Sequence, residues 1–149
     1  MQSIQLPPLE TLWGPVKSDS YDCRSFERLE WVGYLDLVEA AGLMVLESES
    51  VGSYQGEEYV LVRDLESTKF GVLNYGYGSC SGCDLLEAAK SVKDLEDIRD
   101  GFRNAVELFD SPKDLLARIE DPKWIDDFYD KPDNFAKLCR NKLVELGRI

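Results

Sequence analysis

Residues 70–84, Phe-Gly-Val-Leu-Asn-Tyr-Gly-Tyr-Gly-Ser-Cys-Ser-Gly-Cys-Asp, divide the sequence into two parts with different hydrophobic periods. Before this stretch, residues 43–49 and 58–63 are rich in Val, Leu and Tyr, and the turn-rich segment 50–57 separates them. Both segments are typical of antiparallel strands, and residues 70–75 add a third with alternating faces. After Asp84 the apolar period becomes about 3.6 residues, which is typical of helices.

These patterns predict an α+β fold: an N-terminal helix, a three-stranded antiparallel meander and a helical C-terminal half packed on the sheet. The N-terminal helix is expected over residues 25–41, where apolar residues recur at helical spacing before Gly42. The strands follow one another without intervening helices, an order that argues against a doubly wound parallel sheet.

The helical half has clear start and stop signals. Leu95, Ile98, Phe102, Val106 and Phe109 are expected to form one helical stripe. Another helix is expected to begin at an N-cap serine followed by proline, a short element to occupy residues 124–129, and a terminal helix to end at a glycine. The serine and proline are Ser111 and Pro112, and the glycine is Gly147.

A chain of 149 residues is the size of one ordinary domain. We expect an irregular arm over about residues 1–20, an α/β core over about 21–83 and the helical part over about 84–149. The first seventeen residues lack a basic leader and an apolar run, so the sequence predicts a cytoplasmic protein without a membrane span.

The composition excludes several functions. Histidine is absent, which removes imidazole as a general base, a nucleophile partner or a metal ligand. The formal charge of −12 disfavours direct nucleic-acid binding, because such a surface repels phosphate backbones. The sequence therefore predicts no catalytic residue.

The loop before Asp84 is the best candidate site, because its glycines, hydroxyls and thiols differ from its surroundings. Asp84 is expected to cap the following helix. We expect one loop tyrosine to pack on the core and the other to form an aromatic surface with a tyrosine of the facing turn. The candidate interaction or structural residues are Tyr54, Tyr75, Tyr77, Ser79, Cys80, Ser81, Cys83 and Asp84.

The same region resembles a run shared by small proteins of bacteriophages and bacteria that have no assigned reaction. The similarity covers SYQG at 53–56, YVLVRD at 59–64, FGVL at 70–73 and YGYGSCSGCD at 75–84. It implies a phage or mobile-element setting and a shared local scaffold, and it supplies no catalytic residue.

Three interpretations of Cys80 and Cys83 are open. A CxxC pair before a helix is compatible with thiol redox chemistry, although the helical residues that follow do not fit a thioredoxin-like order. The pair also has the spacing of half a zinc site, whose other half would be Cys23 and Cys139. The third interpretation is structural, with small side chains letting the loop pass closely under the helix.

The resulting hypothesis is a small acidic, non-enzymatic protein that binds a protein partner and needs no cofactor. For a phage-type protein, the partner is expected to be a basic, nucleic-acid-handling host protein that it inhibits as a decoy. The alternative is a thiol-redox or zinc protein centred on Cys80 and Cys83.

Overall fold

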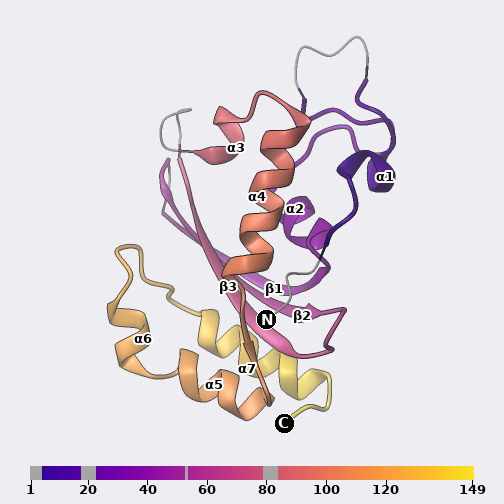
Figure 1. Ribbon diagram of the computed structural model, residues 1–149. Coiled ribbons are helices and arrows are strands. Elements are labelled where there is room, and N and C mark those ends of the chain that lie inside the picture. Colours follow the sequence, from indigo (N-terminus) through magenta and orange to yellow (C-terminus); the bar gives the residue numbers. More distant parts are fainter. Residues whose placement is uncertain (1–4, 18–22, 53, 79–83) are drawn as a thin grey trace.

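A four-stranded antiparallel sheet in the order β1-β2-β3-β4 organises the protein (Figure 1). The computed structural model describes residues 5–17, 23–52, 54–78 and 84–149. The α+β class predicted from the sequence is confirmed. The strands are β1 (Leu43–Gly52), β2 (Gly56–Asp64), β3 (Phe70–Tyr77) and β4 (Glu107–Phe109). The helices are α1 (Leu9–Trp13), α2 (Tyr34–Ala40), α3 (Leu85–Ala88), α4 (Val92–Ala105), α5 (Pro112–Ile119), α6 (Pro122–Asp126) and α7 (Phe135–Glu145).

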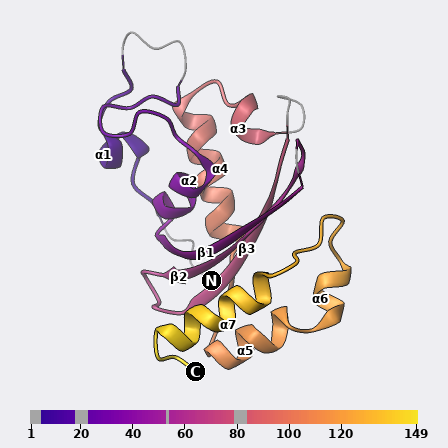
Figure 2. The ribbon, with the colours of Figure 1, turned by 180° about the vertical axis from the view of Figure 1, so that it is seen from behind.

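Helices cover both faces of the sheet, so the protein has three layers. On the first face, Val60, Val62 and Leu73 belong to a buried cluster that also contains residues of α1, α2, α3 and α4. On the second face, Leu61 and Val72 belong to a separate cluster with residues of α5, α6 and α7. The two helical layers are visible on opposite sides of the strands (Figure 2). The predicted helical half therefore divides between the two faces.

β4 brings the chain from one face to the other, and its position corrects the sequence analysis. Val106 and Phe109 were expected to continue a helical stripe, but α4 ends at Ala105. Instead, Phe70 pairs with Phe109 and Gly71 with Leu108, which adds a fourth strand to the meander. A Cβ at Gly71 would lie 2.7 Å from the Glu107 carbonyl oxygen, so only glycine lets β4 approach β3 this closely.

The helix predicted over residues 25–41 is wrong in its first half. α2 begins only at Tyr34, and Phe26 forms isolated bridges with Val16 and Leu29. Gly33 is extended and its amide donates to Asp36 Oδ2 at 2.8 Å, so these two residues start the helix. Phe26 and Val32 are fully buried although neither lies in a helix, so their helical spacing misled the prediction.

The predicted caps of the later helices are confirmed. Ser111 Oγ accepts a hydrogen bond from the Asp114 amide at 3.1 Å, and Pro112 occupies the first turn of α5. α7 ends close to Gly147, which has a φ of +69°. The segment expected to be an irregular arm instead contains the short helix α1, and Leu9 of this helix is fully buried in the cluster on the first face of the sheet. Among the described residues, no helix has the length and apolar character needed to cross a bilayer.

Candidate functional site

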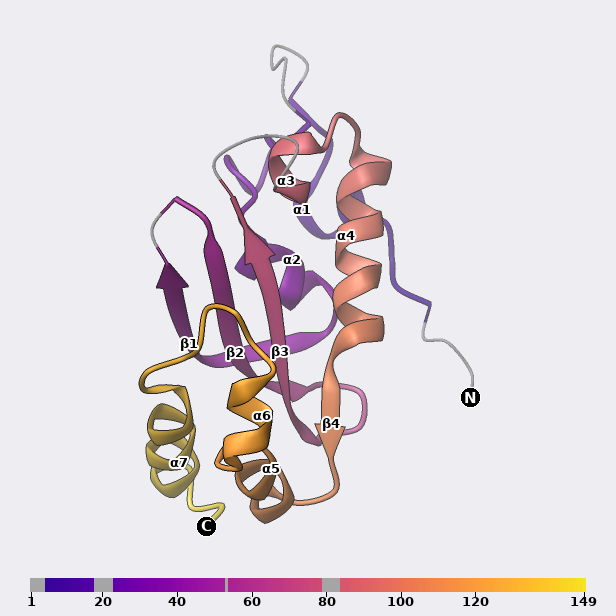
Figure 3. The same cartoon turned by 90° about the vertical axis from the view of Figure 1, so that its left-hand side faces the viewer.

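The predicted site residues that the structure describes lie at one end of the sheet, where the β1–β2 turn, the end of β3 and the start of α3 are close together (Figure 3). We call this region the ribbon end and define it by Tyr54, Tyr77, Asp84 and Leu85. The candidate residues Ser79, Cys80, Ser81 and Cys83 lie outside the described residues. The structure thus places half of the predicted site, together with neighbours that the sequence did not indicate.

A side-chain hydrogen bond from Tyr77 joins β3 to the β1–β2 hairpin. The Tyr77 hydroxyl donates to the Val51 carbonyl oxygen at 3.1 Å, so its side chain crosses β2 to reach β1. The ring passes over Gly56, where a Cβ would lie 2.7 Å from the tyrosine oxygen and 1.9 Å from the Val51 carbonyl oxygen. The close approach at Gly56 therefore sets the shape of the turn that carries Tyr54.

Asp84 is the polar centre of the ribbon end. As predicted, it caps α3: Oδ1 accepts from the amides of Leu86 at 3.0 Å and Glu87 at 3.2 Å. Oδ2 accepts from the Gly78 amide at 3.0 Å, which ties the end of β3 to the start of α3. The Tyr34 hydroxyl also donates to Oδ1. Tyr34 lies on α2, and nothing in the sequence near Asp84 indicated it.

This hydrogen-bond network keeps Asp84 ionised and Tyr34 protonated, so it is poorly suited to proton transfer. Burial raises the pKa of the Asp84 carboxyl, but the hydrogen bonds from Tyr34 and from three amides outweigh burial and keep that pKa below its ordinary value. Burial and the bond to Asp84 raise the pKa of the Tyr34 phenol. At neutral pH, Asp84 is therefore a fully engaged carboxylate and Tyr34 a neutral donor. We assign the pair a structural role.

Tyr75 is the tyrosine that packs on the core. Its ring centroid lies 4.9 Å from those of Tyr34 and Phe102. Its hydroxyl is buried and has no hydrogen-bond partner among the described residues. Burial, followed by the nearby Glu58 carboxylate, raises the pKa of this phenol. Tyr75 thus contributes packing to the site.

The accessible apolar groups of the ribbon end are Tyr54, which is 81% exposed, and Leu85, which is 70% exposed. Leu85 borders a hollow of about 350 Å³ between α3 and α4, which Ala88, Ala89 and Ile98 also line. A second hollow of about 290 Å³ lies beside Asp84. Both hollows are near the lower limit of the volumes typical of small-molecule sites.

The positions of the other two cysteines argue against a four-cysteine zinc site. Cys23 packs against the cluster on the first face of the sheet, whereas Cys139 is fully buried in the cluster on the second face. Thiolates that share a zinc ion each lie about 2.3 Å from it, and a sheet separates these two. Burial raises the pKa of the Cys139 thiol, as expected for a cysteine that packs as an apolar residue. No group of three or more metal-ligating side chains occurs within the described ranges.

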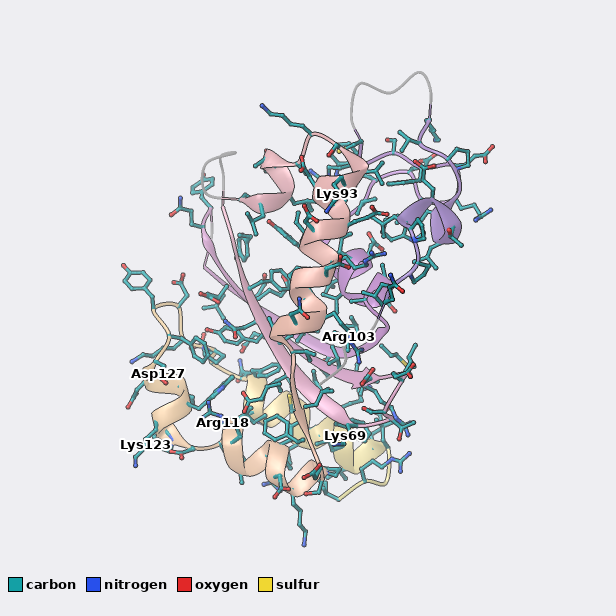
Figure 4. The ribbon with its side chains drawn as sticks, in the orientation of Figure 1. Lys69, Lys93, Arg103, Arg118, Lys123 and Asp127 are labelled. Carbon is teal, nitrogen blue, oxygen red and sulfur yellow. The ribbon has the colours of Figure 1, made fainter. Side chains whose placement is uncertain are left out.

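Many basic side chains of the described chain are matched locally by carboxylates. Figure 4 labels Lys69, which directly precedes β3, Lys93 on α4 and Arg118 on α5. Their amino or guanidinium groups lie within salt-bridge distance of Asp110, Asp97 and Glu107, respectively. The two charges of each pair offset one another locally, and over the whole sequence 29 acidic against 17 basic residues leave the net charge of −12.

Comparisons with family models, curated proteins and solved structures give no match for this chain. The resemblance of residues 53–84 to phage and bacterial proteins stays a prediction.

Proposed function

We propose that this chain is an acidic, non-enzymatic interaction protein that binds a basic, nucleic-acid-handling protein through the ribbon end. The observation that carries the proposal is the exposure of Tyr54 and Leu85 at the same end of the sheet. Large side chains that project from an ordered surface are typical anchors of protein interfaces. The network around Asp84 supports them, since it fixes the start of α3 and therefore the position of Leu85.

The charge of the chain supports a basic partner. A body with a net charge of −12 attracts a basic surface over several ångströms and raises the rate of encounter. A protein that handles nucleic acid presents such a surface where its ligand binds. Occupation of that surface by this chain would exclude the nucleic acid, which makes the chain an inhibitor of the phage-decoy type.

The proposal is tested by measuring the binding of the purified chain to a panel of basic nucleic-acid-binding proteins and to acidic control proteins. We expect saturable binding only to basic members, an affinity that falls steeply as salt rises, and release of bound nucleic acid. Affinity that does not change with salt, or no binding by any basic member, would refute the proposal.

A matched pair of variants tests the ribbon end itself. Tyr54→Ser is expected to weaken binding about tenfold, as loss of an interface anchor does. Tyr129→Ser is the control, because Tyr129 is 98% exposed but lies between α6 and α7. Equal effects of the two variants would exclude Tyr54 as an anchor.

A further inference from the structure

The outer edge of β1 is a second surface that the ribbon end does not explain. β1 has ten residues and forms one edge of the sheet, whereas the opposite edge strand, β4, has only three. Among the described residues, no strand pairs with the outer side of β1. An unpaired strand of this length presents a row of backbone N–H and C=O groups that can pair with another chain.

A register shift divides this edge into two segments. Val45 pairs with Val62 and Glu47 with Leu61, so Leu46 is the extra residue of a β-bulge. Beyond the bulge, residues 47–50 (Glu-Ser-Glu-Ser) pair regularly with β2. We call residues 47–50 the acidic edge. The strand is continuous from there to the turn that carries Tyr54, so the acidic edge adjoins the ribbon end.

The side chains of the acidic edge are ordered by their neighbours. Both carboxylate oxygens of Glu49 accept a hydrogen bond from the backbone amide of Asn134, at 3.1 and 3.0 Å. Lys142 Nζ lies 4.0 Å from Glu47 Oε1, on the same face of the sheet. On the other face, Ser50 Oγ donates to Glu58 Oε2 at 3.1 Å. Two carboxylates thus stand on one face of the edge, and small hydroxyl side chains stand on the other.

This arrangement disfavours a second copy of the chain as the occupant. Antiparallel pairing of two copies about Ser48 would set each Glu47 opposite Glu49 of the other copy. Like charges directly opposite each other destabilise a strand pair, and the net charge of −12 on each copy adds repulsion. A strand with lysine or arginine at alternate positions instead places a cation opposite each carboxylate.

We infer that the acidic edge of β1 accepts an extended segment of the partner as a fifth strand, with basic residues at alternate positions. The inference rests on the proposed function, because it assigns the same basic partner a second contact. Backbone hydrogen bonds supply the pairing, and Glu47 and Glu49 select the charge of the incoming segment.

The probe is a synthetic peptide of about eight residues in which threonine and lysine alternate, an adequate length for a strand. Its binding to the full chain is measured by titration. We expect Glu47→Gln combined with Glu49→Gln to weaken binding about tenfold. The matched control is Glu10→Gln combined with Glu66→Gln, which removes the same charge from exposed positions outside the acidic edge and should leave binding within about twofold. Equal losses in the two double variants would overturn the inference.

Two further peptides test the backbone. In one peptide the backbone nitrogen of every lysine is methylated, and in the other the backbone nitrogen of every threonine is methylated. Both peptides keep the charge of the unmethylated peptide. In a strand, the amides of alternate residues point to opposite edges, so only one of these peptides loses the donors that face β1. We expect one to bind about tenfold more weakly than the other. Equal affinities, or no binding of the parent peptide, would overturn the fifth strand.

The two proposals fail separately. If Tyr54→Ser weakens binding of the basic protein but the two methylated peptides bind with equal affinity, the proposed role of the ribbon end is retained and the proposed fifth strand is wrong. If the two methylated peptides differ in affinity but no basic protein binds the chain, the acidic edge does accept a strand and the proposed function is wrong.

Discussion

The Tyr34 hydroxyl donates a hydrogen bond to the Asp84 carboxylate, and this bond joins α2 to the cap of α3 across fifty residues of sequence. The Leu86 amide in turn donates to the Tyr34 oxygen at 3.0 Å. Tyr34 therefore both donates and accepts at the start of α3. The Tyr75 ring packs against the Tyr34 ring, but the Tyr75 hydroxyl has no hydrogen-bond partner among the described residues. The Tyr34 hydroxyl thus contributes two hydrogen bonds, whereas the neighbouring Tyr75 hydroxyl contributes none among the described residues.

The contrast predicts opposite effects of the same chemical change. Tyr34→Phe should lower the free energy of unfolding by about 2 kcal/mol, because it removes a hydrogen bond to a charged group and leaves the Leu86 amide with one acceptor fewer. Tyr75→Phe should leave stability unchanged or raise it by up to about 1 kcal/mol, because it removes a buried hydroxyl that has no hydrogen-bond partner in the described part of the chain. Urea unfolding measures both. A larger loss for Tyr75→Phe than for Tyr34→Phe would show that the Tyr75 hydroxyl is bonded.

The buried carboxylate of Asp64 makes the stability of the protein depend on pH. Arg103 binds Asp64 through two bonds, Nη1 to Oδ1 at 2.6 Å and Nη2 to Oδ2 at 3.0 Å, and Asp64 is 1% exposed. Burial raises the pKa of the Asp64 carboxyl, but the bonds from Arg103, Ser67 and the Glu66 amide outweigh burial and lower it from 3.8 to about 2. The unfolded chain thus binds the proton more tightly. The contribution of Asp64 is complete above pH 4 or so and is lost as the pH falls toward about 2.

Asp64→Asn should therefore lower stability at neutral pH by about 3–5 kcal/mol, because it leaves the Arg103 charge buried without its partner. It should also flatten the fall in stability between about pH 4 and pH 2. Asp110→Asn is the control, since the Lys69–Asp110 pair is exposed and should change stability by less than about 1 kcal/mol. Urea unfolding over a pH series measures both, and an unchanged acid slope in Asp64→Asn would contradict the assignment.

The strands and caps were predictable because their signals are local. Alternation along residues 70–75 fixes the faces of β3, and a serine followed by proline is enough to start α5. Long-range contacts were not predictable. β4 depends on the missing side chain at Gly71, and its three residues have no period of their own. The partnership of Tyr34 with Asp84 depends on how α2 docks, which no local pattern encodes.

The site was predictable to the same extent. Unusual composition singled out the loop and predicted the cap at Asp84, but it did not say which of Tyr75 and Tyr77 packs on the core. In the structure Tyr75 contacts Tyr34 and Phe102, whereas Tyr77 is half-buried and bonded to Val51. The exposure of Leu85 was hidden, because a leucine in the first turn of a helix ordinarily indicates a buried face. The predicted meander already places its first strand at an edge of the sheet. The register shift at Leu46 was hidden, and this shift decides which face of β1 carries Glu47 and Glu49.

The alternative built on Cys80 and Cys83 gives a separate prediction. The interaction hypothesis expects Cys80→Ser combined with Cys83→Ser to leave the affinity for a basic partner unchanged and to leave the native mass without a metal-dependent shift. A thiol-redox or zinc protein would lose a reversible disulfide or one bound zinc ion in this variant. Native mass spectrometry of protein purified without chelator distinguishes them. Cys139 should resist alkylation in both forms, because burial raises the pKa of its thiol.

Two glycines with opposite surroundings give the sharpest test of the ribbon end. Gly56→Ala would place a methyl group 1.9 Å from the Val51 carbonyl oxygen and 2.7 Å from the Tyr77 hydroxyl, so the hairpin and the Tyr77 ring must both move. We expect this variant to lose about 2–3 kcal/mol of stability. Gly101→Ala, in α4, meets no atom within 4 Å and should gain about 0.5–1 kcal/mol, because alanine is the better helix former. The double variant should show the sum of the two effects, since the sites share no contacts. A stable Gly56→Ala variant would mean that Tyr77 does not cross β2, and the turn that carries Tyr54 would then have no fixed shape.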